Sequence, residues 1–243
     1  AEDSHPQDTP EHRGFLIRTE DGRAQLRIMG SVRIYGAYDF NGLQSCDFFE
    51  VFEIPVGEAN KAEPRFFMTA SQSRIALEAR IESAFLRIEG DFRGESGNQF
   101  HLRHAFLSLK KFLAGQTWSV FSDVSSTPLT VEGEGPPNSA TLRTVQIRFR
   151  SEFAGGAGSW AVAIESPRAE VAEPDSVITL EPFFQSVPDN TTRIRTGGDR
   201  RHLQLAGVVR SITVRRPTGD LDVLAGGGFF SRGFTPLGRR TRS

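Results

Sequence analysis

Apolar and polar residues alternate along much of this chain, and this alternation constrains its fold most. Between residues 25 and 40 one parity carries Leu26, Ile28, Gly30, Val32, Ile34, Gly36, Tyr38 and Phe40. The other parity includes Arg27, Ser31, Arg33 and Asp39. Successive side chains of a β-strand point to opposite faces, so this period of two predicts a strand. The segment is longer than the usual strand of about 5–6 residues, whereas a tilted strand that crosses a bilayer needs about 9–11.

The same pattern recurs along the chain. It is clear in residues 65–80, 85–93, 142–150 and 202–210, and weaker in residues 100–110, 112–120, 160–165, 178–186, 191–196 and 221–230. Glycine, asparagine and aspartate mark short breaks between these segments, and none of them has a helical period over a dozen residues. The sequence therefore predicts an all-β, antiparallel chain with about ten or eleven strands.

Composition excludes several other classes. No run of apolar residues approaches the length of a membrane-spanning helix. The formal net charge of −1 gives no general attraction to nucleic acid. The single cysteine, Cys46, excludes an internal disulfide and a cysteine-based zinc site. The mean hydropathy of −0.34 does not exclude a membrane β-barrel, because such a barrel hides its lipid-facing residues by alternation.

Alternation alone leaves two architectures open. In a soluble β-sandwich the polar parity faces water, whereas in a membrane barrel it faces an aqueous lumen. Arginines recur on this parity in one segment after another: Arg33, Arg74, Arg87, Arg93, Arg148, Arg150 and Arg210. In a barrel they would line a pore and attract anions. The acidic residues Asp39, Glu78, Glu89 and Asp91 share the parity and would partly neutralise the arginines.

The chain divides by pattern into a polar N-terminal segment, residues 1–24, and a β-barrel domain, residues 25–243. Its long connections are residues 41–64, 122–140 and 167–177. Long loops that alternate with short turns are typical of outer-membrane barrels. We expect residues 122–140 to narrow the pore. Its acidic residues Asp123, Glu132 and Glu134 would face basic residues of the wall and create a transverse field.

Motifs of enzymes are absent from the sequence. His101 and His104 differ by three positions, which on a strand points them to opposite faces, so they cannot share a metal ion. The sequence contains no phosphate-binding loop and no dinucleotide-binding fingerprint. An enzyme in the outer membrane would need an acid–base or nucleophile cluster at the rim, and the sequence has none. We therefore predict no catalytic activity, no metal and no cofactor.

Several motifs, in this order, resemble the DcaP-like porins. They are Gly30-Ser-Val-Arg-Ile-Tyr-Gly, Phe66-Phe-Met-Thr-Ala-Ser-Gln-Ser-Arg-Ile, Arg87-Ile-Glu-Gly-Asp-Phe, Leu102-Arg-His-Ala-Phe, Gly115-Gln-Thr-Trp-Ser, Arg143-Thr-Val-Gln-Ile-Arg, Val187-Pro-Asp and His202-Leu-Gln-Leu-Ala-Gly. The resemblance implies a sixteen-stranded porin barrel in the outer membrane of a gram-negative bacterium. It also implies a homotrimer in contact with outer-membrane lipid, without nucleic acid, that passes small anionic solutes such as mono- and dicarboxylates.

The resemblance also implies which residues line the pore. Arg33, Arg74, Arg87 and Arg103 lie inside matching motifs, and Arg148 follows them. Sixteen strands of about ten residues with their loops need well over 300 residues. This chain has 243 and ends without a terminal aromatic residue. We therefore expect either that the last strands are missing or that the chain closes as a smaller barrel.

Two functions follow from the two architectures. The first is an outer-membrane diffusion porin with an arginine-lined lumen for small anions. The alternative is a soluble or surface-attached β-sandwich that binds anionic ligands through its loops. The sandwich requires the leucine, isoleucine and valine parity to pack between two sheets, whereas the barrel exposes it.

Overall fold

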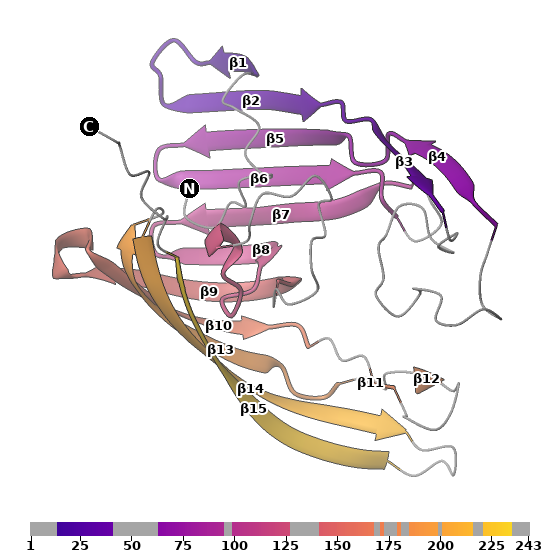
Figure 1. The fold of residues 1–243 in the computed structure, drawn as a ribbon. Helices are drawn as coiled ribbons and strands as arrows, with labels where there is room; N and C mark the ends of the chain where they lie inside the picture. Colours follow the sequence, from indigo (N-terminus) through magenta and orange to yellow (C-terminus); the bar gives the residue numbers. More distant parts are fainter. Residues whose placement is uncertain are drawn as a thin grey trace, which may run out of the picture. The chain divides into compact units, whose positions relative to one another are not determined.

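The computed structural model describes residues 14–40, 63–94, 99–126, 141–167, 171–172, 179–180, 185–198, 201–215 and 221–234 (Figure 1). In these residues the regular structure consists of β-strands and two short 3₁₀ turns, η3 (Val124–Ser126) and η4 (Ala154–Gly156). No helix in the described ranges is long and apolar enough to cross a membrane. The chain forms two compact units, one with the strands up to β7 and one with those from β8 onward.

The N-terminal unit is an antiparallel sheet. Its neighbouring strands follow the order β1 (Phe15–Arg18), β2 (Ala24–Ser31), β5 (Arg74–Ile81), β6 (Ala84–Asp91) and β7 (His101–Leu109). Strands β3 (Tyr35–Asp39) and β4 (Arg65–Thr69) pair with each other in a separate two-stranded sheet. The register between β5 and β6 sets Glu78 opposite Arg87 and Arg74 opposite Asp91, so opposite charges face each other across the strands.

The C-terminal unit has longer strands. Its order is β8 (Phe112–Trp118), β9 (Arg143–Phe153), β10 (Gly158–Glu165), β13 (Asp189–Gly198), β14 (Arg201–Arg215) and β15 (Leu221–Phe234). Strands β11 (Val171–Ala172) and β12 (Thr179–Leu180) form a separate pair. The β14–β15 hairpin is paired continuously from His202 opposite Phe234 to Arg215 opposite Leu221. Both strands are longer than the about 9–11 residues that a tilted strand needs to cross a bilayer.

Two of the expected strands are broken. Residues 25–40 divide into β2 and β3, because the backbone at Arg33 bonds the side chain of Ser73 instead of a neighbouring strand. The N–H of Arg33 donates to Oγ of Ser73 (3.1 Å), and this hydroxyl donates to the carbonyl of Arg33 (3.4 Å). Residues 65–80 divide into β4 and β5 at a turn closed by the bond from the N–H of Ser73 to the carbonyl of Ala70 (2.9 Å).

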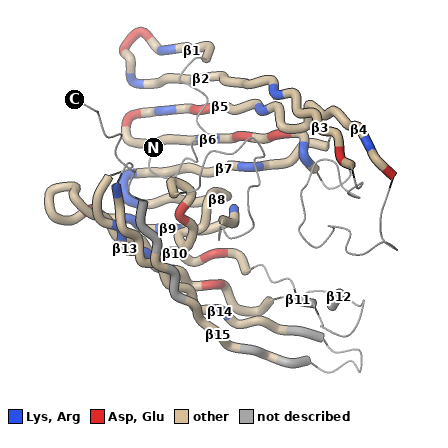
Figure 2. Tube along the Cα trace, in the orientation of Figure 1, with Lys and Arg blue, Asp and Glu red and all other residues tan. Residues whose placement is uncertain are grey.

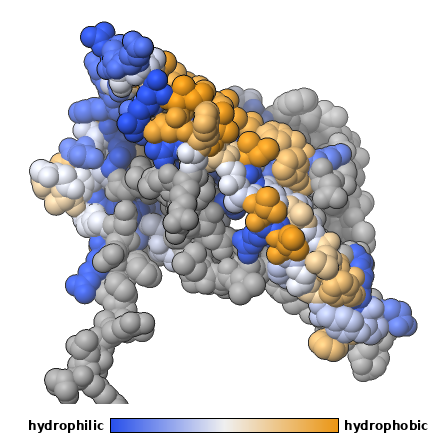
Figure 3. Space-filling model, turned by 90° about the horizontal axis from the view of Figure 1, so that it is seen from above, coloured by the Kyte–Doolittle hydropathy of each residue, from blue (hydrophilic) through white to orange (hydrophobic). Residues whose placement is uncertain are grey.

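Burial is inverted relative to a soluble protein. On β10, Trp160, Val162 and Ile164 are exposed, while Ala161, Ala163 and Glu165 between them are buried. The same alternation continues on β13, where arginines are buried and Ile194 is 51% exposed. Figure 3 shows hydrophobic residues gathered on the surface beside hydrophilic ones. In the described residues the one cluster of buried apolar side chains is Val120, Ala161 and Ala163.

This distribution contradicts the sandwich alternative. A sandwich would have buried the aliphatic parity between two sheets, but Ile147 is 64% and Leu203 58% exposed. Exposed apolar side chains over a whole strand face are expected where the surrounding solvent is lipid. The predicted all-β, antiparallel fold of a membrane protein is thus the one that the structure adopts.

Candidate functional site

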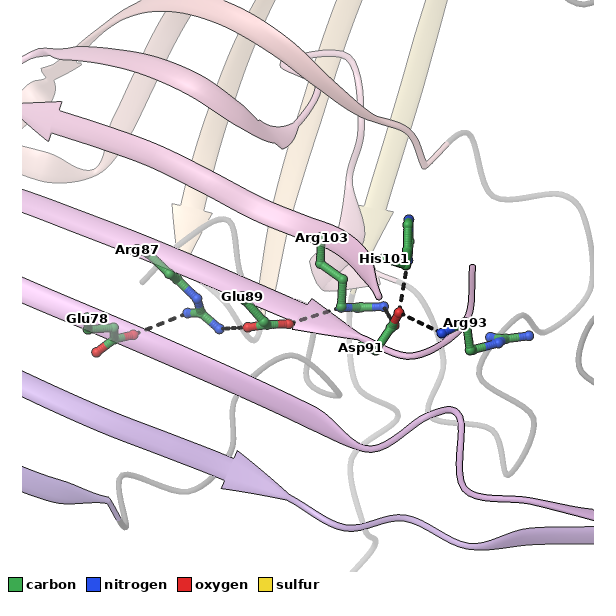
Figure 4. A network of polar contacts seen from close by, with 7 residues as sticks. All are labelled: Glu78, Arg87, Glu89, Asp91, Arg93, His101 and Arg103. Atoms are coloured by element: carbon green, nitrogen blue, oxygen red, sulfur yellow. Dashed lines mark hydrogen bonds and ion pairs between the residues drawn. The ribbon is translucent and has the colours of Figure 1, made fainter. Parts of the chain in front are cut away.

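Six charged or titratable side chains and one backbone N–H form a continuous network in the N-terminal unit (Figure 4). The network, called the β5–β7 network below, consists of Glu78 on β5; Arg87, Glu89 and Asp91 on β6; Arg93 just after β6; and His101 and Arg103 on β7. The period of two places residues 87, 89 and 91 on one face of β6. Figure 2 shows the same concentration of charge along these strands.

Arg103 is the central bridge of this network. Its Nε donates to Glu89 (3.0 Å) and its Nη1 to Asp91 (2.8 Å). Glu89 also accepts from Arg87, whose Nη1 lies 3.4 Å from Oε1 of Glu78. Two guanidinium groups and three carboxylates are therefore joined by direct ion pairs.

His101 and Arg93 complete the network at the end of β6. Nδ1 of His101 lies 2.9 Å from Oδ1 of Asp91, and the backbone N–H of Arg93 donates to the same oxygen (3.3 Å). The His101 side chain is 43% exposed, whereas that of Asp91 is only 2% exposed. The network thus leads from buried carboxylates to a partly exposed imidazole.

A second cluster lies in the C-terminal unit around Asp123, in the segment that follows β8. Oδ2 of Asp123 lies 2.8 Å from Nε2 of His202 on β14, and Oδ1 lies 3.4 Å from Nη1 of Arg195 on β13. The hydroxyl of Ser125 donates to Oδ1 (2.8 Å) and accepts from Nη1 of Arg195 (3.0 Å). The side chains of Asp123 and His202 are both fully buried.

The pKa of the Asp123 carboxyl group reflects these contacts. Burial by itself raises this pKa, because it disfavours the charged form. Hydrogen bonds from His202 and Ser125, with the charges of His202 and Arg195, outweigh burial and lower the pKa below its ordinary value. Asp123 is therefore a carboxylate at neutral pH.

Four of the arginines that the sequence predicts to line a pore lie in the β5–β7 part of the N-terminal unit. Arg87, Arg93 and Arg103 belong to the β5–β7 network, and Arg74 lies on β5 opposite Asp91. Arg33 lies in the break between β2 and β3.

The two later arginines lie on β9 in the C-terminal unit. Arg148 is buried and donates to Gln146 (2.9 Å) and to the carbonyl of Trp118 (2.7 Å). Arg150 is 33% exposed and pairs with Glu152 at 3.4 Å. The two arginines thus differ in role, one binding backbone in the interior and the other remaining near water.

The acidic residues of the expected constriction have different positions. Asp123 is buried against Arg195 and His202, so its charge is neutralised locally instead of facing open water. Glu132 and Glu134 lie outside the described residues.

Sequence reasoning missed several buried polar residues of the C-terminal unit. Arg193 and Arg195 on β13, His202 on β14 and Glu165 on β10 are all buried. A signal existed for two of them, because Arg193 and Arg195 share one parity in residues 191–196 and Ile194 lies between them. In the described residues, no three or more histidine, cysteine, aspartate or glutamate side chains are placed to hold a metal ion.

Comparisons with known proteins agree with this geometry. A family model described as DcaP outer membrane protein matches residues 18–173. A search of curated proteins finds no match. Among solved structures, the crystal structure of the outer membrane channel DcaP of Acinetobacter baumannii is similar, with a TM-score of 0.72 and 22% sequence identity. The alignment covers 91% of this chain and 62% of that channel, so this chain spans less than two thirds of its length.

Proposed function

We propose a diffusion channel for small anionic solutes, because this chain belongs to the DcaP outer membrane protein family. Membership locates the protein in the outer membrane, as the sequence predicts, and the family is one of channels and not of enzymes. The solutes, the selectivity and the subunit number are our proposals.

The observation that carries the anion preference is the unequal exposure of paired charges. Arg210 is 31% exposed while its partner Asp189 is 3% exposed, and Arg87 is 13% exposed against 2% for Glu89. A guanidinium on a long stem reaches water, while a carboxylate on a shorter stem stays near the backbone. In these two pairs water therefore meets the guanidinium more than the carboxylate, whereas in Arg87–Glu78 and Arg150–Glu152 the carboxylate is the more exposed partner.

The proposed mechanism follows from that arrangement. If the polar face lines an aqueous lumen, a carboxylate solute meets guanidinium groups that bind carboxylates with paired hydrogen bonds. Water and salt screen each contact, so the solute also leaves readily. Mono- and dicarboxylates are the solute class that this chemistry favours.

A bilayer experiment tests this function. Protein extracted from outer membranes would be inserted into a planar bilayer, and the reversal potential measured in a potassium chloride gradient. We expect anion preference, and a shift toward cations when Arg33, Arg74 and Arg87 are replaced by glutamine. Arg23→Gln is the control, because Arg23 is 74% exposed at the turn before β2. An unchanged reversal potential in the triple variant would contradict the proposed arginine lining.

Two further parts of the proposal come from the sequence pattern and from the family resemblance, respectively. We propose that residues 122–140 narrow the channel, with Glu132 and Glu134 facing basic wall residues. We also propose that three copies of the chain assemble. Mass measurement of the detergent-extracted protein tests the second point, and a monomeric mass would contradict it.

A further inference from the structure

The segment directly after β8 is fixed unusually firmly to the polar face of the C-terminal unit. Residues 119–126, called the anchored segment below, are mostly buried: Ser119 5%, Val120 0%, Ser122 3%, Asp123 2%, Val124 4% and Ser126 8% exposed. Val120 packs against Ala161 and Ala163 of β10, whose small side chains leave room for it. This apolar contact on an otherwise polar face shows that β10 has a site shaped for the anchored segment.

Glu165 at the end of β10 holds the beginning of the anchored segment. Its Oε1 accepts the backbone N–H of Val120 (2.8 Å), and its Oε2 accepts the hydroxyl of Ser119 (2.7 Å). Both bonds are buried, and both join residues 45 or 46 positions apart in the sequence. One carboxylate thus satisfies a backbone donor and a side-chain donor that would otherwise lack partners away from water.

Asp123 holds the second part of the anchored segment. It binds His202 and Arg195 from two adjacent strands, as described above. Nε2 of Gln204 on β14 donates to the carbonyl of Ser122 (3.2 Å), and the hydroxyl of Ser122 accepts the N–H of Leu142 (3.1 Å). Strands β10, β13 and β14 therefore each contribute a side chain that binds the anchored segment.

We infer that Glu165 and Asp123 are positioning residues that hold the anchored segment against the wall and thereby set the width of the channel. This inference rests on the proposed function, because it takes the polar face as the lumen wall. Neither carboxylate needs to touch a passing solute. Both act through the backbone of residues 119–123, with His202 and Arg195 as the wall partners of Asp123.

A cysteine reporter tests the anchoring independently of conductance. Val124→Cys in a Cys46→Ser background places the only thiol in the buried part of the segment. In detergent-solubilised folded protein, Asp123→Asn and Glu165→Gln should each raise the rate of maleimide modification at least about tenfold, because the segment then opens more often. Asp189→Asn is the matched control, since Asp189 is equally buried but pairs with Arg210, outside the segment.

Conductance in planar bilayers supplies the second readout. We expect single-channel conductance to rise and to fluctuate more in both variants, and to stay at the parent value in Asp21→Asn, whose carboxylate is 58% exposed at the turn before β2. Modification rates no faster than in the control would overturn the anchoring. Faster modification with parental conductance would overturn the role in channel width.

One outcome separates this inference from the proposed function. A parent protein without conductance, but with the contrast in modification rates, would refute the channel while retaining the anchoring. If Asp123→Asn fails to fold, His202→Gln removes the same contact from the wall side. It should then raise the modification rate in the same direction, and a parental rate would overturn the anchoring.

Discussion

Arg103 shows what a single buried guanidinium contributes on the polar face. Its side chain is 8% exposed and bridges Glu89 and Asp91, both only 2% exposed. Arg103→Met would leave two buried carboxylates without this cation, and we expect a loss of about 3–5 kcal/mol in the free energy of unfolding. Denaturant titration of protein refolded into detergent or lipid measures this loss.

Arg150 provides the matched control for that prediction. It forms an ion pair too, but Arg150 is 33% and Glu152 61% exposed, so water screens the attraction. Arg150→Met should cost no more than about 1 kcal/mol. Equal losses in the two variants would show that burial does not decide the strength of these pairs.

The lowered pKa of Asp123 predicts how the free energy of unfolding depends on pH. Because its folded-state pKa lies below the ordinary value of 3.8, its contribution is complete well above that value. The contribution is lost as the pH falls below about 4 and through the folded-state pKa. The difference in unfolding free energy between the parent and Asp123→Asn should therefore shrink as the pH falls from 5 toward 3. A difference that stays constant from pH 5 to pH 3 would contradict the lowered pKa of Asp123.

At the scale of the element, β9 offers a test of which face meets lipid. Ile147, in the middle of this strand, is 64% exposed. In a soluble protein Ile147→Lys would have little effect, whereas a lysine facing the middle of a bilayer costs about 2–4 kcal/mol. Phe153→Lys at the end of the same strand should cost at most about 1 kcal/mol. Unfolding in lipid vesicles measures both, and equal small losses would contradict a lipid-facing β9.

The backbone conformation at the end of β13 requires glycine at one position. Gly197 has φ of +92°, and a Cβ there would lie 2.3 Å from the carbonyl oxygen of Arg201. Because that neighbour is backbone, Gly197→Ala should destabilise the protein by about 1–3 kcal/mol. At Gly198, without positive φ, a Cβ meets nothing within 4 Å. Gly198→Ala should therefore leave the unfolding midpoint unchanged or slightly raised, and equal effects at the two glycines would contradict the strain.

The strands that could be predicted from sequence are those with a clear alternation of apolar and polar residues within the strand itself. Alternation in residues 85–93 and 202–210 indicated β6 and β14, and it grouped Arg87, Glu89 and Asp91 on one face. It missed β1 (Phe15–Arg18), which is short and lies in a polar segment.

The contacts of the site were less predictable. Asp123 and His202 are 79 positions apart, and periodicity carries no information on which distant side chains meet. The break at Arg33 depends on Ser73, 40 positions away, for the same reason. Pattern therefore predicts which face a residue occupies, while pairing requires the three-dimensional register.

At the scale of the whole molecule, inverted burial and family membership lead to the same conclusion. A protein with exposed Ile147 and Leu203 and buried Arg148 and Arg195 has its polar groups inside and its apolar groups outside. That arrangement is stable only where the surroundings are less polar than the interior, as in a membrane. The match to the DcaP outer membrane protein family identifies that membrane.

Salt should tune the selectivity of the whole molecule. If arginines such as Arg87 and Arg210 attract anions through water, their field reaches about 10 Å at 0.1 M salt but only about 3 Å at 1 M. The ratio of anion to cation permeability, from reversal potentials in equal concentration gradients, should therefore fall toward one between these concentrations. As a control, the rate at which an uncharged sugar enters proteoliposomes should not change with salt concentration. A changed rate would show that salt alters the size of the channel opening. A permeability ratio that is the same at both concentrations would contradict this prediction. It would show that selectivity comes from direct contacts with the solute and not from the electrostatic field of the arginines.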